Sequence, residues 1–322
     1  MKTTLQGFGI NVDLNHFDQY SIGVMTDTIQ AIRAQWVRLE ICSRKYAHPE
    51  QISGLILFAK KCQELKIPIV GLFSDFVPLT FKNLFFPEIE HRPIMSRLSE
   101  YEEFVKKILV HATPHIDHWE IWNEQNSKRF WIQEPSPEEY MVLLRRVTKL
   151  IKSKQKNATI IFGGIFGNDI TPTFSFNYEK ILISKQYIQR AISAGAMNLV
   201  EYVAFHPYVR DCHISVRTGK EIYTSIIQRI EETIAQYPKL PLIVSEIGVS
   251  PLLNLRVKAQ EIAEVYQKLI HYSNTSNIPL CIYTLSDQHG KFYSSFNPER
   301  NFGFLDFDLR PKPLLNEYLK LL

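Results

Sequence analysis

The sequence predicts an α/β protein of the (β/α)8, or TIM, barrel class. Short apolar runs rich in Val, Ile and Phe recur along all 322 residues, and amphipathic helical patterns lie between them. Strands that alternate strictly with helices imply βαβ crossovers and a parallel sheet. About eight strand–helix units of this length close a barrel. No linker or low-complexity segment interrupts them, so we expect residues 1–322 to form a single domain.

The expected strands are apolar runs bounded by polar or turn-forming residues. They cover residues 7–12, 36–41, 68–73, 118–123, 159–164, 199–205, 242–247 and 280–285. The helical patterns between them open with Ser, Asp or Pro and an acidic first turn in several cases, as helices tend to do. We expect helices over residues 49–65, 96–112, 136–154, 221–237 and 258–273.

An open doubly wound sheet is the alternative architecture. Such a sheet usually carries a glycine-rich phosphate loop directly after its first strand. Residues 7–16, GFGINVDLNH, lead into polar residues instead, and residues 162–167, FGGIFG, match neither phosphate fingerprint. The closed barrel is therefore preferred.

Composition excludes several partners. A hydrophobic content of 45% can fill one large core without disulfides or metals. Lys and Arg number 37 against 33 Asp and Glu, and no basic run could track a phosphate backbone, so we expect no nucleic-acid partner. The four cysteines lie far apart without a Cys-x-x-Cys pair, so we expect reduced, packed thiols at Cys42, Cys62, Cys212 and Cys281.

The amino-terminal segment MKTTLQGFGINVDLNHF has neither an apolar signal-peptide core nor a small-residue cleavage site. No stretch approaches the 18 or so apolar residues of a membrane span. We therefore expect a cytoplasmic protein without a membrane partner, or a secreted one if a leader precedes this sequence. The oligomeric state is not readable from the sequence.

Long segments follow the third, fifth and eighth expected strands, at residues 74–95, 165–177 and 286–313. In a barrel these loops emerge on the face where sites are built. Their aromatic residues offer flat surfaces that could stack on sugar rings, among them Phe292 and Tyr293. Half or more of these aromatics are expected only to pack the loops onto the barrel.

Two acidic residues stand where strands leave the core. Asn123 and Glu124 end the fourth strand in WEIWNEQNSKRFW, and Glu246 ends the seventh in LIVSEI. A carboxylate in such a place must be hydrogen-bonded, ion-paired or neutralised. One such residue would fit a satisfied ion pair at the rim, but two at strand ends indicate a functional site.

This arrangement resembles clan A of the glycoside hydrolases, the retaining β-glycosidase barrels that include families 5 and 39. In that clan an Asn-Glu pair ends strand four and supplies the acid/base, which corresponds to Asn123 and Glu124. A Glu at the end of strand seven is the nucleophile, which corresponds to Glu246. The terminal segment NFGFLDFDLRPKP is similar to the one that closes such barrels. The resemblance spans nearly the whole chain and implies a carbohydrate substrate and no cofactor or metal.

The resemblance also assigns supporting residues. An Arg on strand two corresponds to Arg38, and the His-x-Tyr after strand six corresponds to His206 and Tyr208, where the His could orient the Tyr or touch the sugar. Two departures stand out: Gln125 replaces the usual Pro after Asn-Glu, and the strand-eight Trp that underlies the sugar is missing. Candidate replacements for that Trp are Tyr283, His289, Phe292 and Tyr293.

Retaining hydrolysis requires carboxyl groups roughly 5 to 5.5 Å apart, which strand ends on facing walls of a narrow barrel can provide. Arg38 and Tyr208 would lower the pKa of Glu246 and keep it ionised, and its charge would raise the pKa of Glu124. Once Glu246 is esterified, Glu124 can act as a base toward water. The neutral amide of Asn123 can donate to a sugar 2-hydroxyl.

Other candidates carry less specific signals. Glu120 should point into the barrel and form a buried ion pair, with Arg38 as one candidate partner. Asp75 and Asp287 follow strands three and eight, where they could bind sugar hydroxyls or equally cap the next element. Trp131, which closes the fourth-strand motif, is a further expected sugar-binding residue.

Three histidines, His111, His115 and His118, suggest a metal site at first sight. Pro114 interrupts any helix there, and the segment precedes strand four, which places it on the stability face of a barrel. We therefore expect no metal. The sequence predicts a retaining β-glycoside hydrolase that cleaves an oligosaccharide or polysaccharide. A non-catalytic glycan-binding barrel, suggested by the two departures, and a transglycosylase of the same fold are the alternatives.

Overall fold

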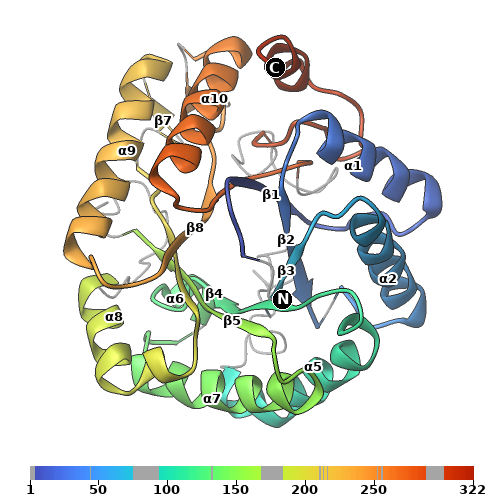
Figure 1. The fold of residues 1–322 in the computed structure, drawn as a ribbon, viewed down its shortest axis with the longest axis vertical. Helices are drawn as coiled ribbons and strands as arrows, with labels where there is room; N and C mark the ends of the chain where they lie inside the picture. Colours follow the sequence, from blue (N-terminus) through green and yellow to red (C-terminus); the bar gives the residue numbers. More distant parts are fainter. Residues whose placement is uncertain are drawn as a thin grey trace, which may run out of the picture.

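The chain folds into a closed barrel of eight parallel strands in a computed structural model (Figure 1). The structure describes residues 4–43, 45–74, 94–131, 133–167, 184–209, 212, 214–215, 217–251, 253–254, 257–287 and 301–322. Around the barrel the strands follow the order β1-β10-β8-β6-β5-β4-β3-β2, with every neighbouring pair parallel. The predicted (β/α)8 fold is confirmed.

Each predicted strand run overlaps one barrel strand, and four strands extend one or two residues beyond their predicted ends. The barrel strands are β1 (Phe8–Val12), β2 (Trp36–Cys42), β3 (Ile69–Ser74), β4 (His118–Asn123), β5 (Thr159–Phe166), β6 (Tyr202–His206), β8 (Leu242–Ile247) and β10 (Leu280–Ile282). Outside the barrel, β7 (Ile214–Ser215) and β9 (Leu253–Asn254) form a small two-stranded parallel sheet.

Helices form a ring around the strands in Figure 1. Five of them match the predicted helical patterns: α2 (Pro49–Glu64), α5 (Leu98–Ala112), α7 (Pro137–Lys154), α9 (Gly219–Gln236) and α10 (Ala259–Ser276). The described helices without a predicted counterpart are α1 (Gln19–Ala31), α6 (Lys128–Trp131), α8 (Ser184–Ser193) and α11 (Pro313–Leu319). There are also two described 3-10 turns: η1 (Ile94–Arg97), which overlaps the start of the range predicted for α5, and η2 (Ala196–Asn198).

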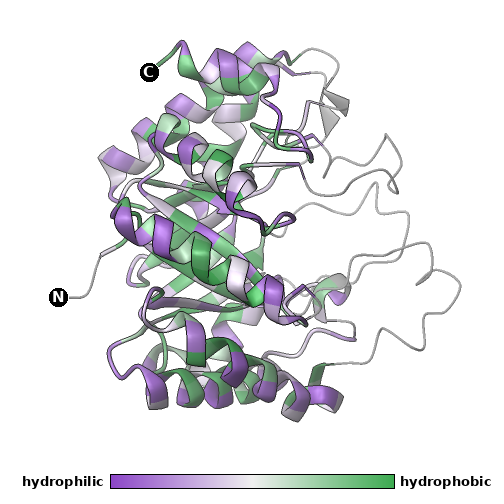
Figure 2. Cartoon of the chain, turned by 90° about the vertical axis from the view of Figure 1, so that its right-hand side faces the viewer, coloured by the Kyte–Doolittle hydropathy of each residue, from purple (hydrophilic) through white to green (hydrophobic). Residues whose placement is uncertain are grey.

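Local signals explain where helices begin. The Ser136 hydroxyl accepts the backbone N–H of Glu139 at the start of α7, and Pro137 occupies the first helical position. Thr218 and Glu221 form a reciprocal capping box at the start of α9. Such caps satisfy backbone donors that would otherwise have no partner. The buried residues of α5, α7 and α10 are mainly apolar. Figure 2 shows apolar and polar residues alternating along the helices.

The apolar side chains of the described residues form two separate clusters. The larger fills the layer between the strands and the helices. The smaller lies inside the barrel and consists of Leu5, Trp36, Val70, Ile161, Ala204, Ile243 and Cys281, with Tyr202 packed against it. All four cysteines are buried, as expected of packed thiols. Among the described residues, no helix is both long and apolar enough to cross a membrane.

Candidate active site

The polar layer inside the barrel follows from strand periodicity. Residues two positions apart on a strand share a face. Arg38, His206 and Ser245 each stand two positions after a member of the smaller apolar cluster, and each is almost fully buried. They therefore lie one layer closer to the end of the barrel at which the strands finish, which we call the mouth.

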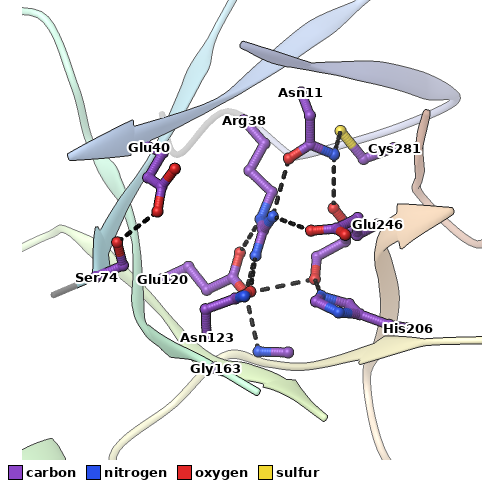
Figure 3. Close-up of polar contacts among 12 residues, drawn as sticks. Asn11, Arg38, Glu40, Ser74, Glu120, Asn123, Gly163, His206, Glu246 and Cys281 are labelled. Carbon is purple, nitrogen blue, oxygen red and sulfur yellow. Dashed lines mark hydrogen bonds and ion pairs between the residues drawn. The ribbon is translucent and has the colours of Figure 1, made fainter. Parts of the chain in front are cut away.

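Arg38 is the centre of this layer (Figure 3). Its Nε and Nη2 atoms donate to the two carboxylate oxygens of Glu120, at 2.6 and 3.0 Å. Its Nη1 donates to Oδ1 of Asn11 at 2.9 Å and to Oε2 of Glu246 at 3.0 Å. A further bond from Nη2 reaches Oδ1 of Asn123 at 2.8 Å. One guanidinium thus orients two carboxylates and two amides.

The Arg38–Glu120 pair confirms the expected buried ion pair. Burial by itself would lower the pKa of Arg38, but the charges of Glu120 and Glu246 outweigh it and raise that pKa. The backbone N–H of Gly164 donates to Oε1 of Glu120 at 2.9 Å. Charge-assisted bonds of this kind are what a buried carboxylate needs to stay ionised.

The end of β4 departs from regular strand geometry. Trp122 and Glu124 have φ angles of 71° and 48°, in the left-handed region that few residues other than glycine adopt. As a result Ile121 and Trp122 both pack in the outer apolar cluster, whereas Asn123 and Glu124 both find partners inside the barrel. A regular strand would send one of these last two outward. Strain of this kind concentrates at functional sites.

A second irregularity turns Glu246 inward. Leu280 pairs with Val244 and Ile282 with Ile247, so β8 carries one extra residue between these pairs. Such a bulge re-aims side chains. Ser245 and the next residue, Glu246, consequently both contact groups inside the barrel.

His206 lies between Glu124 and Ser245 and contacts both side chains. Its Nδ1 lies 2.8 Å from Oε1 of Glu124, and its Nε2 lies 3.0 Å from Oγ of Ser245. Burial lowers the pKa of His206 to about 4, because an imidazolium here would lose its water. The Glu124 contact is therefore a hydrogen bond to a neutral ring at pH 7. A neutral imidazole has one donor and one acceptor nitrogen.

Glu246 receives a second hydrogen bond on its other carboxylate oxygen. The Tyr208 hydroxyl donates to Oε1 of Glu246 at 3.1 Å, whereas Arg38 donates to Oε2. Both interactions stabilise the ionised carboxylate. The Glu246 side chain retains 13% exposure, so it is accessible from the mouth.

The two glutamates converge. One carboxylate oxygen of Glu124, one of Glu246 and a ring nitrogen of His206 all lie within 4.8 Å of one another. Carboxyl separations of about 5 to 5.5 Å are typical of retaining glycosidases, and roughly 6.5 to 9.5 Å of inverting ones. The observed approach fits the shorter spacing.

The same three residues could offer ligands to a metal ion. Two observations favour acid–base chemistry instead. The guanidinium of Arg38 already contacts Glu246, so a metal would place a second cation beside it. Both ring nitrogens of His206 also have partners, in Glu124 and Ser245.

The remaining predicted sugar-binding residues fall into two groups. Trp131 is fully buried, packs edge-on against Trp122 and donates to Glu139, and Asp287 accepts from the Gly303 backbone and pairs with Lys312. Both have structural partners and take no part in the function proposed below. Four candidates lie outside the described residues: Asp75, His289, Phe292 and Tyr293.

Sequence reasoning missed several contributors. Asn11 donates to the Ser245 carbonyl at 3.2 Å and accepts from Arg38, and its inward position on β1 was a usable signal. Gln125, in the usual place of Pro, is fully buried and donates to the Gly163 carbonyl at 2.8 Å, so it fastens the end of β4 to β5. Adjacent glycines in a buried strand were the signal for that close approach.

The structure is thus a closed (β/α)8 barrel with a pair of carboxylates at its mouth. No family model matches the chain, and no curated protein matches it. Solved structures do. GH5_18 from Streptomyces cattleya, in complex with GlcNAc, is similar with a TM-score of 0.67 and 15% identity, over 98% of this chain and 80% of that chain.

Two further structures extend the likeness. For the exo-beta-1,4-mannosidase Op5Man5 from Opitutaceae bacterium strain TAV5, the TM-score is 0.61 at 14% identity, over 98% of this chain and 59% of that chain. For Bacteroides uniformis beta-glucuronidase 2, the values are 0.58 and 16%, over 98% and 35%. The chain thus spans less than two thirds of both. The resemblance to clan A barrels is confirmed at the level of the fold.

Proposed function

We propose that this protein is a cofactor-independent retaining β-glycoside hydrolase that cleaves an oligosaccharide or polysaccharide. The observation that carries the proposal is the approach of Glu124 and Glu246 to within 4.8 Å at the mouth of the barrel. The fold shared with proteins named as a mannosidase and a beta-glucuronidase supports it.

In the first step Glu246 attacks the anomeric carbon. Arg38 and Tyr208 hold its carboxylate ionised and aimed, through bonds of 3.0 and 3.1 Å. A bond forms between a Glu246 oxygen and the anomeric carbon, the bond to the leaving oxygen breaks, and Glu124 gives that oxygen its proton. The product is a glycosyl ester of Glu246.

In the second step the roles reverse. Esterification removes the negative charge of Glu246, so Glu124 is more easily kept ionised and can accept a proton from water. The water oxygen attacks the anomeric carbon and Glu246 leaves as a carboxylate. Asn123 assists in both steps: its Oδ1 accepts from Arg38, which turns its amide nitrogen away from the guanidinium and toward a sugar 2-hydroxyl.

The test is a panel of aryl β-glycosides and polysaccharides, with Glu246→Ala beside the wild type. The variant should lose turnover, and azide should restore it with an α-glycosyl azide as product, because azide fills the space of the missing nucleophile. Glu40→Ala is the matched control, since Glu40 is another carboxylate at the mouth, bonded to Ser74 rather than to Arg38; it should show no azide rescue.

Full activity of Glu246→Ala would refute the assignment. Saturable oligosaccharide binding without released reducing ends would instead favour the non-catalytic glycan-binding barrel. Longer products in the presence of an added acceptor sugar would favour the transglycosylase.

A further inference from the structure

A hydrogen-bond chain links Glu124 to a second, fully buried carboxylate. From Oε1 of Glu124 it passes to Nδ1 of His206 at 2.8 Å and from Nε2 of His206 to Oγ of Ser245 at 3.0 Å. The Ser245 hydroxyl then donates to Oε1 of Glu120 at 3.4 Å. His206, Ser245 and Glu120 are each at most 1% exposed, so water does not compete for these contacts.

The Glu120 end of this hydrogen-bond chain determines in which direction each hydrogen bond is donated. Glu120 holds two bonds from Arg38, so it is ionised and can only accept hydrogen bonds. If the Ser245 hydroxyl donates to Glu120, its oxygen accepts the proton on Nε2 of His206. The neutral ring then has an unprotonated Nδ1, which can accept only from a protonated Glu124. In the opposite arrangement, the Ser245 hydroxyl would donate to Nε2 of His206. The Ser245 oxygen would then face the Glu120 carboxylate without a proton between them.

We propose that Ser245 is a positioning residue, whose hydroxyl fixes the His206 tautomer with the proton on Nε2 and thereby favours the protonated form of Glu124. This inference rests on the proposed function only for the role it gives to Glu124. The mechanism above uses Glu246 to keep Glu124 protonated, and the chain through Ser245 supplies a second means.

Several charged groups surround Glu124. Among the described residues, His206 faces it from β6, Glu246 from β8, and Arg38 with Glu120 lies behind them. The charges of Glu246 and Glu120 favour the protonated acid, whereas Arg38 opposes it. Removing the Ser245 hydroxyl changes none of these charges, so its effect isolates the hydrogen-bond chain.

The tautomer can be measured without any substrate. Protein labelled with 15N-histidine is examined by NMR between pH 5 and pH 8, and the His206 signals are assigned by their loss in His206→Gln. The wild type should show a neutral ring protonated on Nε2. Ser245→Ala should move the proton to Nδ1, and Ser245→Thr, which keeps a hydroxyl, should preserve Nε2. Ser74→Ala is the matched control, because Ser74 also donates to a carboxylate at the mouth; it should leave the tautomer unchanged.

A kinetic arm gives a second readout. In Ser245→Ala the alkaline limb of kcat/KM should move to lower pH by about one unit, since one hydrogen bond to the acid form is lost. Turnover should fall about tenfold for poor leaving groups, and much less for good ones, which need no acid. Ser245→Thr should restore both.

The role of Ser245 and the proposed hydrolase function can be refuted independently of each other. The role of Ser245 is overturned if the wild-type ring is protonated on Nδ1, or if the tautomer is unchanged in Ser245→Ala. The first of these results comes from the wild-type spectrum alone, so it can be obtained even if Ser245→Ala folds poorly. An Nε2 tautomer in a protein that turns over no glycoside supports the chain and counts against the hydrolase.

Discussion

The guanidinium of Arg38 lies between two carboxylates, with Nη1 3.0 Å from Oε2 of Glu246 and Nε 2.6 Å from Oε2 of Glu120. Of these two acids, Glu120 is fully buried and Glu246 reaches the mouth. One cation thus offsets a structural charge and holds a reactive one. This sharing ties the stability of the barrel to the ionisation of the proposed nucleophile.

Replacing Arg38 by Met should cost about 3–5 kcal/mol of the free energy of unfolding, because Glu120 would remain buried without its partner. Urea denaturation of the purified variant measures this. The double change Arg38→Met with Glu120→Leu should recover most of the stability and none of the glycosidase activity. A single variant as stable as the wild type would show that Glu120 does not depend on Arg38.

Gly164 is required for the approach of His206. A Cβ at position 164 would lie 2.1 Å from Nε2 of His206, well inside van der Waals contact. We therefore expect Gly164→Ala to displace His206 from Glu124, lower the free energy of unfolding by about 1–3 kcal/mol and reduce turnover of substrates with poor leaving groups.

Gly23→Ala is the matched control for that change. Gly23 lies within α1, and a Cβ there meets nothing within 4 Å. Alanine should stabilise the helix by roughly 0.5–1 kcal/mol and leave kinetics as they are. A loss of activity in both variants would mean that Gly164 has no special role.

Much of the barrel and its inner layer could be predicted from periodicity. The alternation of residues along the strand predicts that Glu120 points into the barrel, and the run VRLEI predicts the same for Arg38. Their ion pair could therefore be predicted from the sequence. Helix α1 was missed because its sequence, QYSIGVMTDTIQA, mixes a glycine and β-branched residues with few charges, which weakens the helical pattern.

The tips of the strands could not be predicted in the same way. Asn123 and Glu124 share the inner side only because Trp122 adopts a positive φ, and Glu246 turns inward only through the bulge in β8. Both depend on pairing with distant strands, which no local pattern encodes. The resemblance to a known clan supplied these residues, whereas Ser245, which has no place in that motif, was overlooked.

Glu124→Gln should separate the two chemical steps. An amide cannot protonate a leaving oxygen, so we expect kcat/KM to fall by about 10²–10⁴ for alkyl or sugar leaving groups and far less for a dinitrophenyl group. Glu246→Gln should lose activity with both. Rates for a series of aryl glycosides measure the leaving-group dependence; an equal loss for every member in Glu124→Gln would argue against its role as the acid.

Stability should fall as the pH drops through the range in which His206 gains a proton. Its pKa is about 4 in the folded protein, below the ordinary value of 6.5, so the unfolded chain binds the proton more readily. The contribution of the neutral ring is complete above about pH 6.5 and is lost as the pH falls toward 4. Its size is about 3 kcal/mol at 1.36 kcal/mol per pKa unit.

His206→Gln removes this titration, so the difference in unfolding free energy between pH 7 and pH 4.5 should be smaller in the variant than in the wild type. Urea denaturation at both values measures it. Because Gln can still hydrogen-bond Glu124 or Ser245, the variant should stay folded at pH 7. Identical pH dependence in the two proteins would mean that His206 titrates normally, and that its ring is not held neutral by burial.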